Sequence, residues 1–215
     1  MKEVYIIGSG GLAAEITEYI LQNNASNQEE ITILGYFDLD EKQYINYGFT
    51  APFLGDETKY NFLEKDKVLI AIGDLNIRTK AIEYFESINI EIESFIHHTS
   101  LIAGSSKLGR GNIVCPYTII GPNTSVGNYN LINYQCAIPH DCKVGNLNVF
   151  SPNIQLTGYC NVGNRNLFGL SSGLKPSISL GDNNKIQPGL IVDKNISNDS
   201  LVFKIEKIKI MELYK

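Results

Sequence analysis

Apolar residues recur at every sixth position through the second half of the chain. The series contains only branched aliphatic residues and Phe, and no position interrupts it. Its members are Ile102, Leu108, Val114, Ile120, Val126, Ile132, Ile138, Val144, Phe150, Leu156, Val162, Phe168, Leu174, Leu180, Ile186 and Val192. An α-helix repeats every ~3.6 residues and a flat strand every two, so neither produces this period. A period of six is typical of a β-helix, in which short strands turn corners and stack as coils.

Glycines, prolines and small residues keep fixed places in the same repeat. Glycine often follows the aliphatic residue directly, and five of the seven prolines stand two places after it. Small residues such as Thr124 and Cys142 stand four places after it, where an inward side chain has little room. Three repeats make one triangular coil, with proline at its corners, so residues three repeats apart should stack. The second half is therefore predicted to be a solenoid.

Strand and helix signals alternate in the first half. Apolar runs at residues 3–7, 31–37, 67–73 and 90–96 predict strands, and residues 12–22 and 76–87 show helical patterns. This order is typical of a parallel sheet with crossover helices, whose ligands bind beyond the carboxyl ends of the strands. The loop at residues 8–11, Asp38 and the loop at residues 73–74 should then share one rim.

The loop at residues 8–11 reads Gly-Ser-Gly-Gly and lies between a predicted strand and a helix. It could cradle a phosphate or a nucleotide edge, or it could be only a tight turn. It is not the phosphate-binding loop of ATP- and GTP-hydrolysing enzymes. Nor is it a full dinucleotide fingerprint, because Ala13 stands where the last glycine belongs.

Composition narrows the class of protein. The 215 residues are 43% hydrophobic and 19% charged, with a net charge of -5. These values fit a chain with a buried core, and they disfavour nucleic acid or an anionic membrane as a partner. No apolar run is long enough to span a bilayer, and the first residues lack a signal-peptide pattern. We expect a soluble cytoplasmic protein.

Four cysteines and three histidines show no metal-binding spacing. We expect the cysteines to be free, buried thiols and no metal to be bound. His97 and His98 lie between the two halves and are expected to be linker or packing residues.

His140 is the histidine whose position suggests chemistry. It occupies the corner slot that proline usually takes, so its imidazole should point outward. Asp141 follows it and could fix its tautomer and stabilise its charged form. Gly158 stands in the same corner of the next coil, where a backbone N–H could approach a ligand. The alternative is a solvated corner with no function.

The whole chain resembles the sugar acyltransferases of the NeuD and PglD type. The resemblance rests on Ile7-Gly8-Ser9-Gly10-Gly11, Gly35-Tyr36-Phe37-Asp38, Ala71-Ile72-Gly73-Asp74 with Arg78, Phe95-Ile96-His97 and Ile138-Pro139-His140-Asp141-Cys142-Lys143-Val144-Gly145. It implies a small Rossmann-like domain followed by a left-handed β-helix. It also implies a homotrimer that uses acetyl-CoA and has its active sites in clefts between adjacent β-helices.

The same resemblance assigns roles to individual residues. His140 matches the general base, Asp141 the acidic residue beside it, and Asn133 a polar residue near the acceptor amine. The positions implied to contact acetyl-CoA are Val149, Gly158, Leu170 and Pro188. Those implied to form the nucleotide pocket are Gly10, Gly11, Leu12, Asp38, Leu39 and Gly73. Leu12, Leu39 and Val149 replace polar residues common in relatives, and the usual Gly-x-Pro-Ala tail is absent.

Together these observations predict an acetyl-CoA-dependent N-acetyltransferase with a His general base, acting by direct transfer. Its substrate would be the amino group of a nucleotide-linked amino-deoxy sugar in surface-polysaccharide synthesis. Two alternatives stay open: a sialic-acid-type sugar O-acetyltransferase, and a non-catalytic trimeric scaffold or sugar-nucleotide sensor. The predicted divisions are a nucleotide-sugar-binding domain at 1–97, a β-helix domain at 98–193 and a tail at 194–215. The sugar, its ring position and the nucleotide base are not determined by the sequence.

Overall fold

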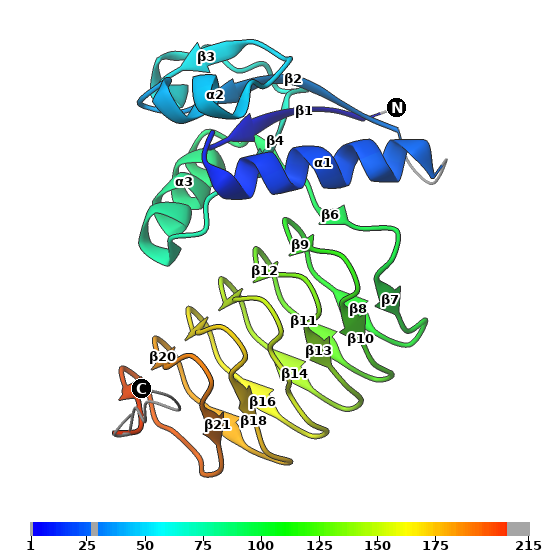
Figure 1. The fold of residues 1–215 in the computed structure, drawn as a ribbon, viewed down its shortest axis with the longest axis vertical. Helices are drawn as coiled ribbons and strands as arrows, with labels where there is room; N and C mark the ends of the chain where they lie inside the picture. The colour runs from blue at the N-terminus through cyan, green and yellow to red at the C-terminus, as the bar shows by residue number, and fades with distance from the viewer. Residues whose placement is uncertain (1, 27–29, 206–215) are drawn as a thin grey trace, which may run out of the picture.

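The computed structural model describes residues 2–26 and 30–205. An α/β domain formed by the first part of the chain lies at one end of a long solenoid (Figure 1). Both halves therefore have the fold class that the sequence predicts.

The α/β domain is built on a five-stranded parallel sheet. The strand order is β3-β2-β1-β4-β5. The strands are β1 (Lys2–Ile7), β2 (Ile31–Phe37), β3 (Phe53–Gly55), β4 (Lys67–Ile70) and β5 (Glu91–Ile92). The helices are α1 (Gly11–Ala25), α2 (Lys42–Tyr47) and α3 (Leu75–Ser87), with a 3-10 turn at Glu57–Lys59. The predicted strand at 67–73 ends at Ile70, and the next three residues form a loop.

Alternation along β1 gives the sheet two different faces. Val4 and Ile6 pack with α1, whereas Tyr5 and Ile7 pack with α3. All four side chains are buried, as expected for a parallel sheet covered on both sides. The helix α1 lies between this sheet and the solenoid (Figure 1), so one helix packs against both the sheet and the outer surface of the solenoid.

The solenoid has three sides, each a stack of two-residue parallel strands. One side holds β6 (Phe95–Ile96), β9 (Ile113–Val114), β12 (Leu131–Ile132), β15 (Val149–Phe150), β17 (Leu167–Phe168), β20 (Lys185–Ile186) and β22 (Leu201–Val202). The next holds β7 (Leu101–Ile102), β10 (Ile119–Ile120), β13 (Ala137–Ile138), the bridging residue Gln155, β18 (Gly173–Leu174) and β21 (Ile191–Val192). The third holds β8 (Lys107–Leu108), β11 (Ser125–Val126), β14 (Lys143–Val144), β16 (Asn161–Val162) and β19 (Ser179–Leu180).

Strand pairing extends beyond both predicted ends of the β-helix domain. Phe95 and Ile96 pair with β9, so the first solenoid strand lies before residue 98. At the other end β22 pairs with β20, beyond residue 193. Residues 206–215 of the predicted tail lie outside the described residues.

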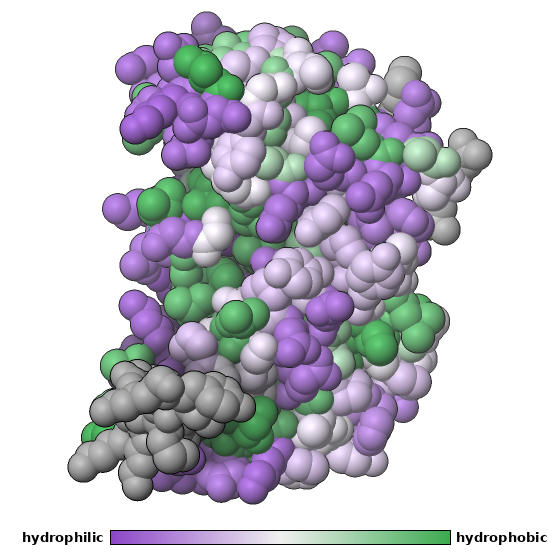
Figure 2. Space-filling model, viewed as in Figure 1, coloured by the Kyte–Doolittle hydropathy of each residue, from purple (hydrophilic) through white to green (hydrophobic). Residues whose placement is uncertain are grey.

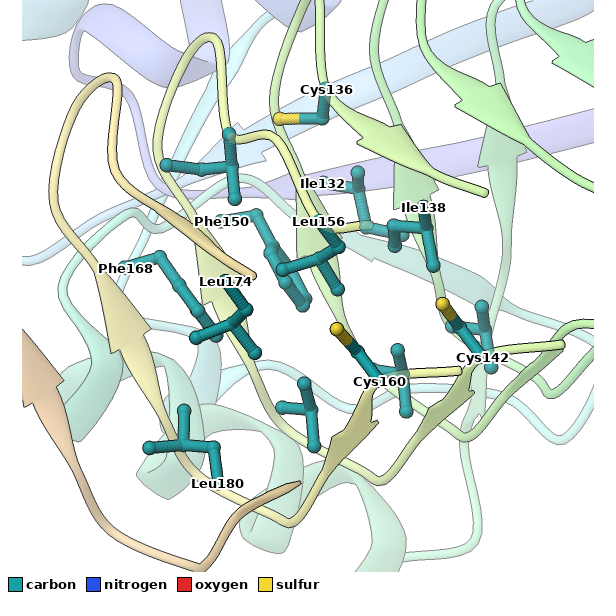
Figure 3. Packing of buried hydrophobic residues seen from close by; sticks show 14 of the residues in the cluster. Ile132, Cys136, Ile138, Cys142, Phe150, Leu156, Cys160, Phe168, Leu174 and Leu180 are labelled. Atoms are coloured by element: carbon teal, nitrogen blue, oxygen red, sulfur yellow. The ribbon is translucent and has the colours of Figure 1, made fainter. Parts of the chain in front are cut away.

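The sixth-position series forms the solenoid core. From Val114 to Val192 every member is at most 5% exposed, and Ile102 and Leu108 pack on this core at its first coil. Phe150 and Phe168 stack with ring centroids 4.7 Å apart (Figure 3). All four cysteines are free and buried, which confirms that prediction. Burial raises the pKa of the Cys136 thiol to about 12, so it stays protonated at neutral pH.

Each corner places one residue in the left-handed backbone region, a regularity that the sequence analysis missed. The residue after the corner slot has a positive φ in nearly every coil, for example 58° at Tyr117 and 57° at Asp141. Proline followed by such a residue is the pattern of a type II turn. The glycine directly before the corner slot is needed for a different reason, which is the close approach of the next coil. A Cβ on Gly121 would lie 2.7 Å from the backbone nitrogen of His140 in the next coil.

A ladder of buried asparagines runs along a second inward position. Its members are Asn112, Asn130, Asn148, Asn166 and Asn184, each spaced by one coil and at most 1% exposed. Nδ2 of Asn148 donates to Oδ1 of Asn130 at 3.0 Å and to the Gly163 carbonyl at 2.9 Å. The ladder satisfies backbone groups that the corner leaves unpaired inside the core.

The outward residues distinguish the three sides. We call the β9-β12-β15 side the covered side, because Ile113, Leu131 and Val149 pack under α1 in one apolar cluster. The β11-β14-β16 side is the polar side and presents Lys107, Ser125, Lys143, Asn161 and Ser179. The β10-β13 side is the open side: Leu101 is 65% exposed, Ile119 45% and Ile191 50%. Figure 2 shows apolar patches at the solenoid surface separated by polar side chains.

Buried Arg78 joins the two domains. Its guanidinium donates to the carbonyls of Ile70 and Ile72 in the sheet domain and to that of Tyr129 in the solenoid. Burial lowers the Arg78 pKa to about 10, which still leaves it charged at neutral pH. On the surface nearby, Glu86 accepts from the Tyr129 hydroxyl at 2.6 Å. These bonds fix the solenoid against the carboxyl end of β4.

Candidate active site

His140 occupies the corner between the open side and the polar side. It follows β13 and precedes β14, and its side chain is 53% exposed. Its Nδ1 lies 2.9 Å from Oδ2 of Asp141, and its ring meets Tyr159 edge to face at 5.2 Å between centroids. Among the described residues we find no hydrogen bond to Nε2. The imidazole is therefore held at one nitrogen and available at the other.

Asp141 orients the imidazole. Hydrogen bonding to His140 lowers the pKa of Asp141, and a weaker bond from Asn123, at 3.4 Å, acts in the same direction. Asp141 is thus ionised at neutral pH. An ionised acceptor favours the tautomer with a proton on Nδ1, so Nε2 is left as a proton acceptor.

Gly158 lies directly against the imidazole, as its place one coil later predicts. A Cβ at this position would come within 2.5 Å of Cε1 and 2.8 Å of Nε2 of His140. Only glycine leaves this space open. Pro122 and Pro176 occupy the same slot three coils apart, so stacking of the coils requires no N–H there.

Asn133, Leu170 and Pro188 lie on the other edge of the open side. Each follows a strand of the covered side and precedes the open side. Tyr134 N donates to Oδ1 of Asn133 at 2.8 Å. Leu170 is exposed, and Pro188 lines a cavity of about 540 Å³ together with Phe203. Within one chain the open side separates these residues from His140.

Val149 lies apart from the other residues that the resemblance assigns to acetyl-CoA. It is 4% exposed and packs in the cluster beneath α1. Its outward position on the covered side explains this burial, because the α/β domain occupies that surface. The structure therefore brings Val149 into the domain interface rather than to either edge of the open side.

The six residues assigned to the nucleotide pocket do come together. Gly10, Gly11, Leu12, Asp38, Leu39 and Gly73 line one cavity of about 360 Å³ beyond the carboxyl ends of β1, β2 and β4. Asp38 accepts from the backbone N and the hydroxyl of Ser9, both at 2.8 Å, and so fixes the glycine loop. Gly10 caps α1 without a side-chain bond, which leaves the first N–H groups of the helix for a ligand.

The same cavity contains residues that the sequence analysis missed, most notably Glu57. Glu57 follows β3, a strand too short to give an apolar signal. Ile72 and Ile77 also line it. A search for acidic residues after every strand of the sheet could have found Glu57.

His97 and His98 are packing residues, as expected. His97 is 1% exposed, and its ring nitrogens lie 2.8 Å from Oγ1 of Thr99 and 3.1 Å from Oε1 of Gln22. Burial, with a smaller effect of His98, lowers the His97 pKa to about 4. His98 contacts Oδ1 of Asn23 in α1.

Residues 2–26 and 30–205 contain neither a metal-binding cluster nor a membrane-spanning helix. No group of three or more His, Cys, Asp or Glu side chains in this part of the chain is arranged to hold a metal ion. No helix within it has the length and apolar character needed to cross a membrane.

The α/β domain is similar to a known protein family. The family model of the PglD N-terminal domain matches residues 3–85. None of the curated proteins matches the chain significantly.

Solved structures match over nearly the whole chain. A mutant of perosamine N-acetyltransferase from Caulobacter crescentus, in complex with CoA and GDP-perosamine, has a TM-score of 0.80 at 21% identity and covers 97% of this chain and 98% of its own. The acetyltransferase domain of PglB from Neisseria gonorrhoeae, with acetyl coenzyme A, has a TM-score of 0.79 at 19% identity over 93% of this chain and 96% of its own. WeeI from Acinetobacter baumannii has a TM-score of 0.65 at 16% identity over 94% and 97%.

At these identities the structural likeness establishes the fold, which confirms the left-handed β-helix. The resemblance found in the sequence is likewise confirmed. Residues 3–85 match the family model of the PglD N-terminal domain, and the chain as a whole shares its fold with perosamine N-acetyltransferase and the PglB acetyltransferase domain.

Proposed function

We propose that the protein is an acetyl-CoA-dependent N-acetyltransferase that acts on the amino group of a nucleotide-linked amino sugar. The observation that carries the proposal is the exposed His140 imidazole, held at Nδ1 by ionised Asp141 and lying against Gly158. The structural relatives support it, since perosamine N-acetyltransferase was solved with CoA and GDP-perosamine and the PglB domain with acetyl-CoA. The reaction would take place in the cytoplasm, in surface-polysaccharide synthesis.

His140 is the general base of this proposal. As the sugar amine attacks the thioester carbonyl, its proton passes to Nε2, and Asp141 stabilises the imidazolium that results. A general base contributes about 10²–10⁴-fold to such a step. The acetyl group passes directly from the thioester sulfur to the amine nitrogen. The proton on His140 then passes to the departing thiolate of CoA.

Gly158 leaves space beside the imidazole and supplies a backbone hydrogen-bond donor for the thioester. Its backbone N–H would face the thioester carbonyl, whose oxygen becomes negative as the tetrahedral intermediate forms. Removal of one such donor costs about 10²–10³-fold in enzymes of this kind. Any side chain at this position would push the imidazole away.

The site is complete only between protomers. The two edges of the open side carry complementary parts: His140 and Gly158 on one, Asn133, Leu170 and Pro188 on the other. In a ring of copies with their open sides facing the axis, one edge of each chain meets the other edge of its neighbour. Exposed Leu101, Ile119 and Ile191 provide an apolar surface for that contact. We propose a homotrimer with three such shared clefts.

The α/β domain would hold the nucleotide part of the sugar substrate. The helix α1 is fifteen residues long, and its N-terminus has no side-chain cap. This N-terminus offers N–H groups and the positive end of the helix dipole to the diphosphate. Glycine at positions 10, 11 and 73 lets a ligand approach the backbone closely.

The direct test is release of free CoA from acetyl-CoA in the presence of a panel of nucleotide-linked sugars. We expect release with amino-deoxy sugars, a product heavier by one acetyl group, and none with the matching sugars that carry a hydroxyl at that ring position. Free and nucleotide-activated sialic acid test O-acetylation. Transfer to hydroxyl groups alone, or to no sugar of the panel, would overturn the proposal.

A further inference from the structure

Glu57 lines the nucleotide pocket, and its backbone is anchored by neighbouring residues. The preceding Asp56 caps this turn by accepting from the backbone N of Thr58 at 2.9 Å. The carbonyl of Glu57 accepts from the Tyr84 hydroxyl at 3.4 Å. The side chain therefore starts from a fixed point at the end of β3.

Glu57 differs from the other carboxylates around this end of the sheet. Asp38 holds the Ser9 loop, Asp74 caps α3 by accepting from two backbone N–H groups, and Asp56 caps its own turn. The Glu57 carboxylate receives no hydrogen bond or ion pair from another residue in the described part of the chain. It is half-buried, and burial raises its pKa, with the negative charges of Asp56 and Asp38 adding to the effect. A carboxylate in such a place is stabilised by a donor that arrives with a ligand.

The rest of the cavity wall is largely apolar. Phe37, Leu39, Ile72 and Ile77 line it, and no lysine, arginine or histidine of the described chain does. The strand order β3-β2-β1 places Glu57 on the far side of Asp38 from the N-terminus of α1. A nucleotide whose phosphates lie at α1 would therefore direct its base toward β3 and Glu57.

No cation lines this cavity, so the hydrogen-bond donors for Glu57 come with the ligand. Glu57 lies beyond Asp38 from α1, which assigns these donors to the base rather than to the ribose. Guanine is the common base with two adjacent donors, the ring N1–H and the 2-amino group, and they match the two oxygens of a carboxylate. Uracil and thymine offer one N–H between two carbonyl oxygens, which a carboxylate repels. Adenine and cytosine place an acceptor ring nitrogen beside their amino group.

We propose that Glu57 makes this pocket selective for guanine, so that the substrate of the enzyme is a GDP-linked amino sugar. This inference rests on the proposed function for the sugar and the acetyl group, but its own observation is a carboxylate in the pocket wall that no other residue of the described chain engages. Glu57 is a specificity-determining residue that contacts the base and takes no part in acetyl transfer.

The test is binding of nucleoside diphosphates to the full chain, measured by calorimetry without acetyl-CoA. We expect GDP to bind about 10- to 100-fold more tightly than UDP, dTDP or ADP, the discrimination typical of a paired base contact. IDP lacks the 2-amino group and should bind about tenfold more weakly than GDP. Glu57→Gln should weaken GDP at least about tenfold and improve UDP relative to it, because an amide can pair with one N–H and one carbonyl.

Glu64→Gln is the matched control. Glu64 is exposed and lies outside the cavity, so the same loss of one charge should leave the order of affinities unchanged. Equal binding of GDP and UDP, a GDP affinity unchanged in Glu57→Gln, or no binding of any nucleotide would overturn the inference.

The outcome separates this inference from the proposed function. Acetyl transfer to a UDP-linked amino sugar without preference for GDP would refute the role of Glu57 and leave the acetyltransferase standing. Selective GDP binding without acetyl transfer to any GDP-linked sugar would do the reverse.

Discussion

The covered and open sides of the solenoid carry similar apolar residues outward but lie in different surroundings. On the covered side the partner is α1 of the same chain, and Leu131 and Val149 are buried beneath it. On the open side Leu101 and Ile119 are exposed because nothing in the described chain packs over them. The difference suggests that one side stabilises the fold of a single chain and that the other assembles and completes the site.

The histidines follow the same division. His97 is buried at the edge of the covered side, with both ring nitrogens in contact with polar side chains. His140 stands exposed at the edge of the open side with one nitrogen available. Identical side chains thus have a structural role in one place and a proposed catalytic role in the other.

The largest effect should come from filling the space beside His140. Gly158→Val places carbon atoms where the imidazole now lies, so the ring must leave its position against Asp141. We expect kcat/KM for acetyl transfer to fall about 10²–10⁴-fold, the contribution of a general base. Gly104→Val is the matched control, because Gly104 occupies the same slot three coils earlier and a Cβ there meets nothing within 4 Å. If kcat/KM fell equally in the two variants, the space beside His140 would be no more important for acetyl transfer than the same slot in another coil.

A smaller effect should come from a charge on the open side. Ile119→Lys adds a cation to each protomer at a surface proposed to be shared, and should raise the dissociation constant of the assembly at least about 30-fold. Sedimentation velocity at a range of concentrations measures this shift, and activity should fall with it. Ser179→Lys makes the same change on the polar side and should alter neither. An Ile119→Lys protein that stays assembled would show that the open side is not the interface.

The smallest effect concerns the covered side and appears as a dependence of stability on pH. The unfolded chain binds a proton at His97 near pH 6.5, whereas the folded chain binds it only near pH 4. Between these values the unfolded state holds more protons, so the free energy of unfolding must fall as the pH falls. The loss due to His97 should be about 1 kcal/mol by pH 5.5.

Urea denaturation at pH 7.5 and at pH 5.5 measures that loss. His97→Gln removes the titrating group, so its stability should change less between the two pH values than that of the wild type. Identical changes in the two proteins would mean that His97 titrates alike in the folded and unfolded chains.

The sixth-position series was enough to predict the solenoid and its core, because side chains that repeat every six residues all point into the interior of such a solenoid. The corner at His140 with Gly158 against it also follows from that register. The asparagine ladder was not foreseen, because Asn148 and its equivalents occupy a repeat position that holds small residues such as Cys142 at the other corners. Their role depends on the carbonyls they meet, and these are visible only once the coils are stacked.

The outward-facing residues of the solenoid carry information that the inward-facing series does not. Residues such as Ile113 and Leu131, directly before members of the series, are apolar on one side of the solenoid and polar on another. This pattern distinguishes a covered side from a solvated one, but it does not say what covers it. For that reason the burial of Val149 beneath α1 could not be predicted. Glu57 was missed because it follows a strand of only three residues.

The central claim is that His140 accepts the proton of the attacking amine, and one measurement tests it most directly. The rate of acetyl transfer is compared between the wild-type protein and His140→Ala, with CoA binding and assembly measured on the same samples. We predict that transfer falls at least about 10²-fold while binding and assembly persist, because the half-exposed ring packs only against Tyr159 and Gly158 at the surface. A His140→Ala protein that transfers acetyl at the wild-type rate would contradict the account.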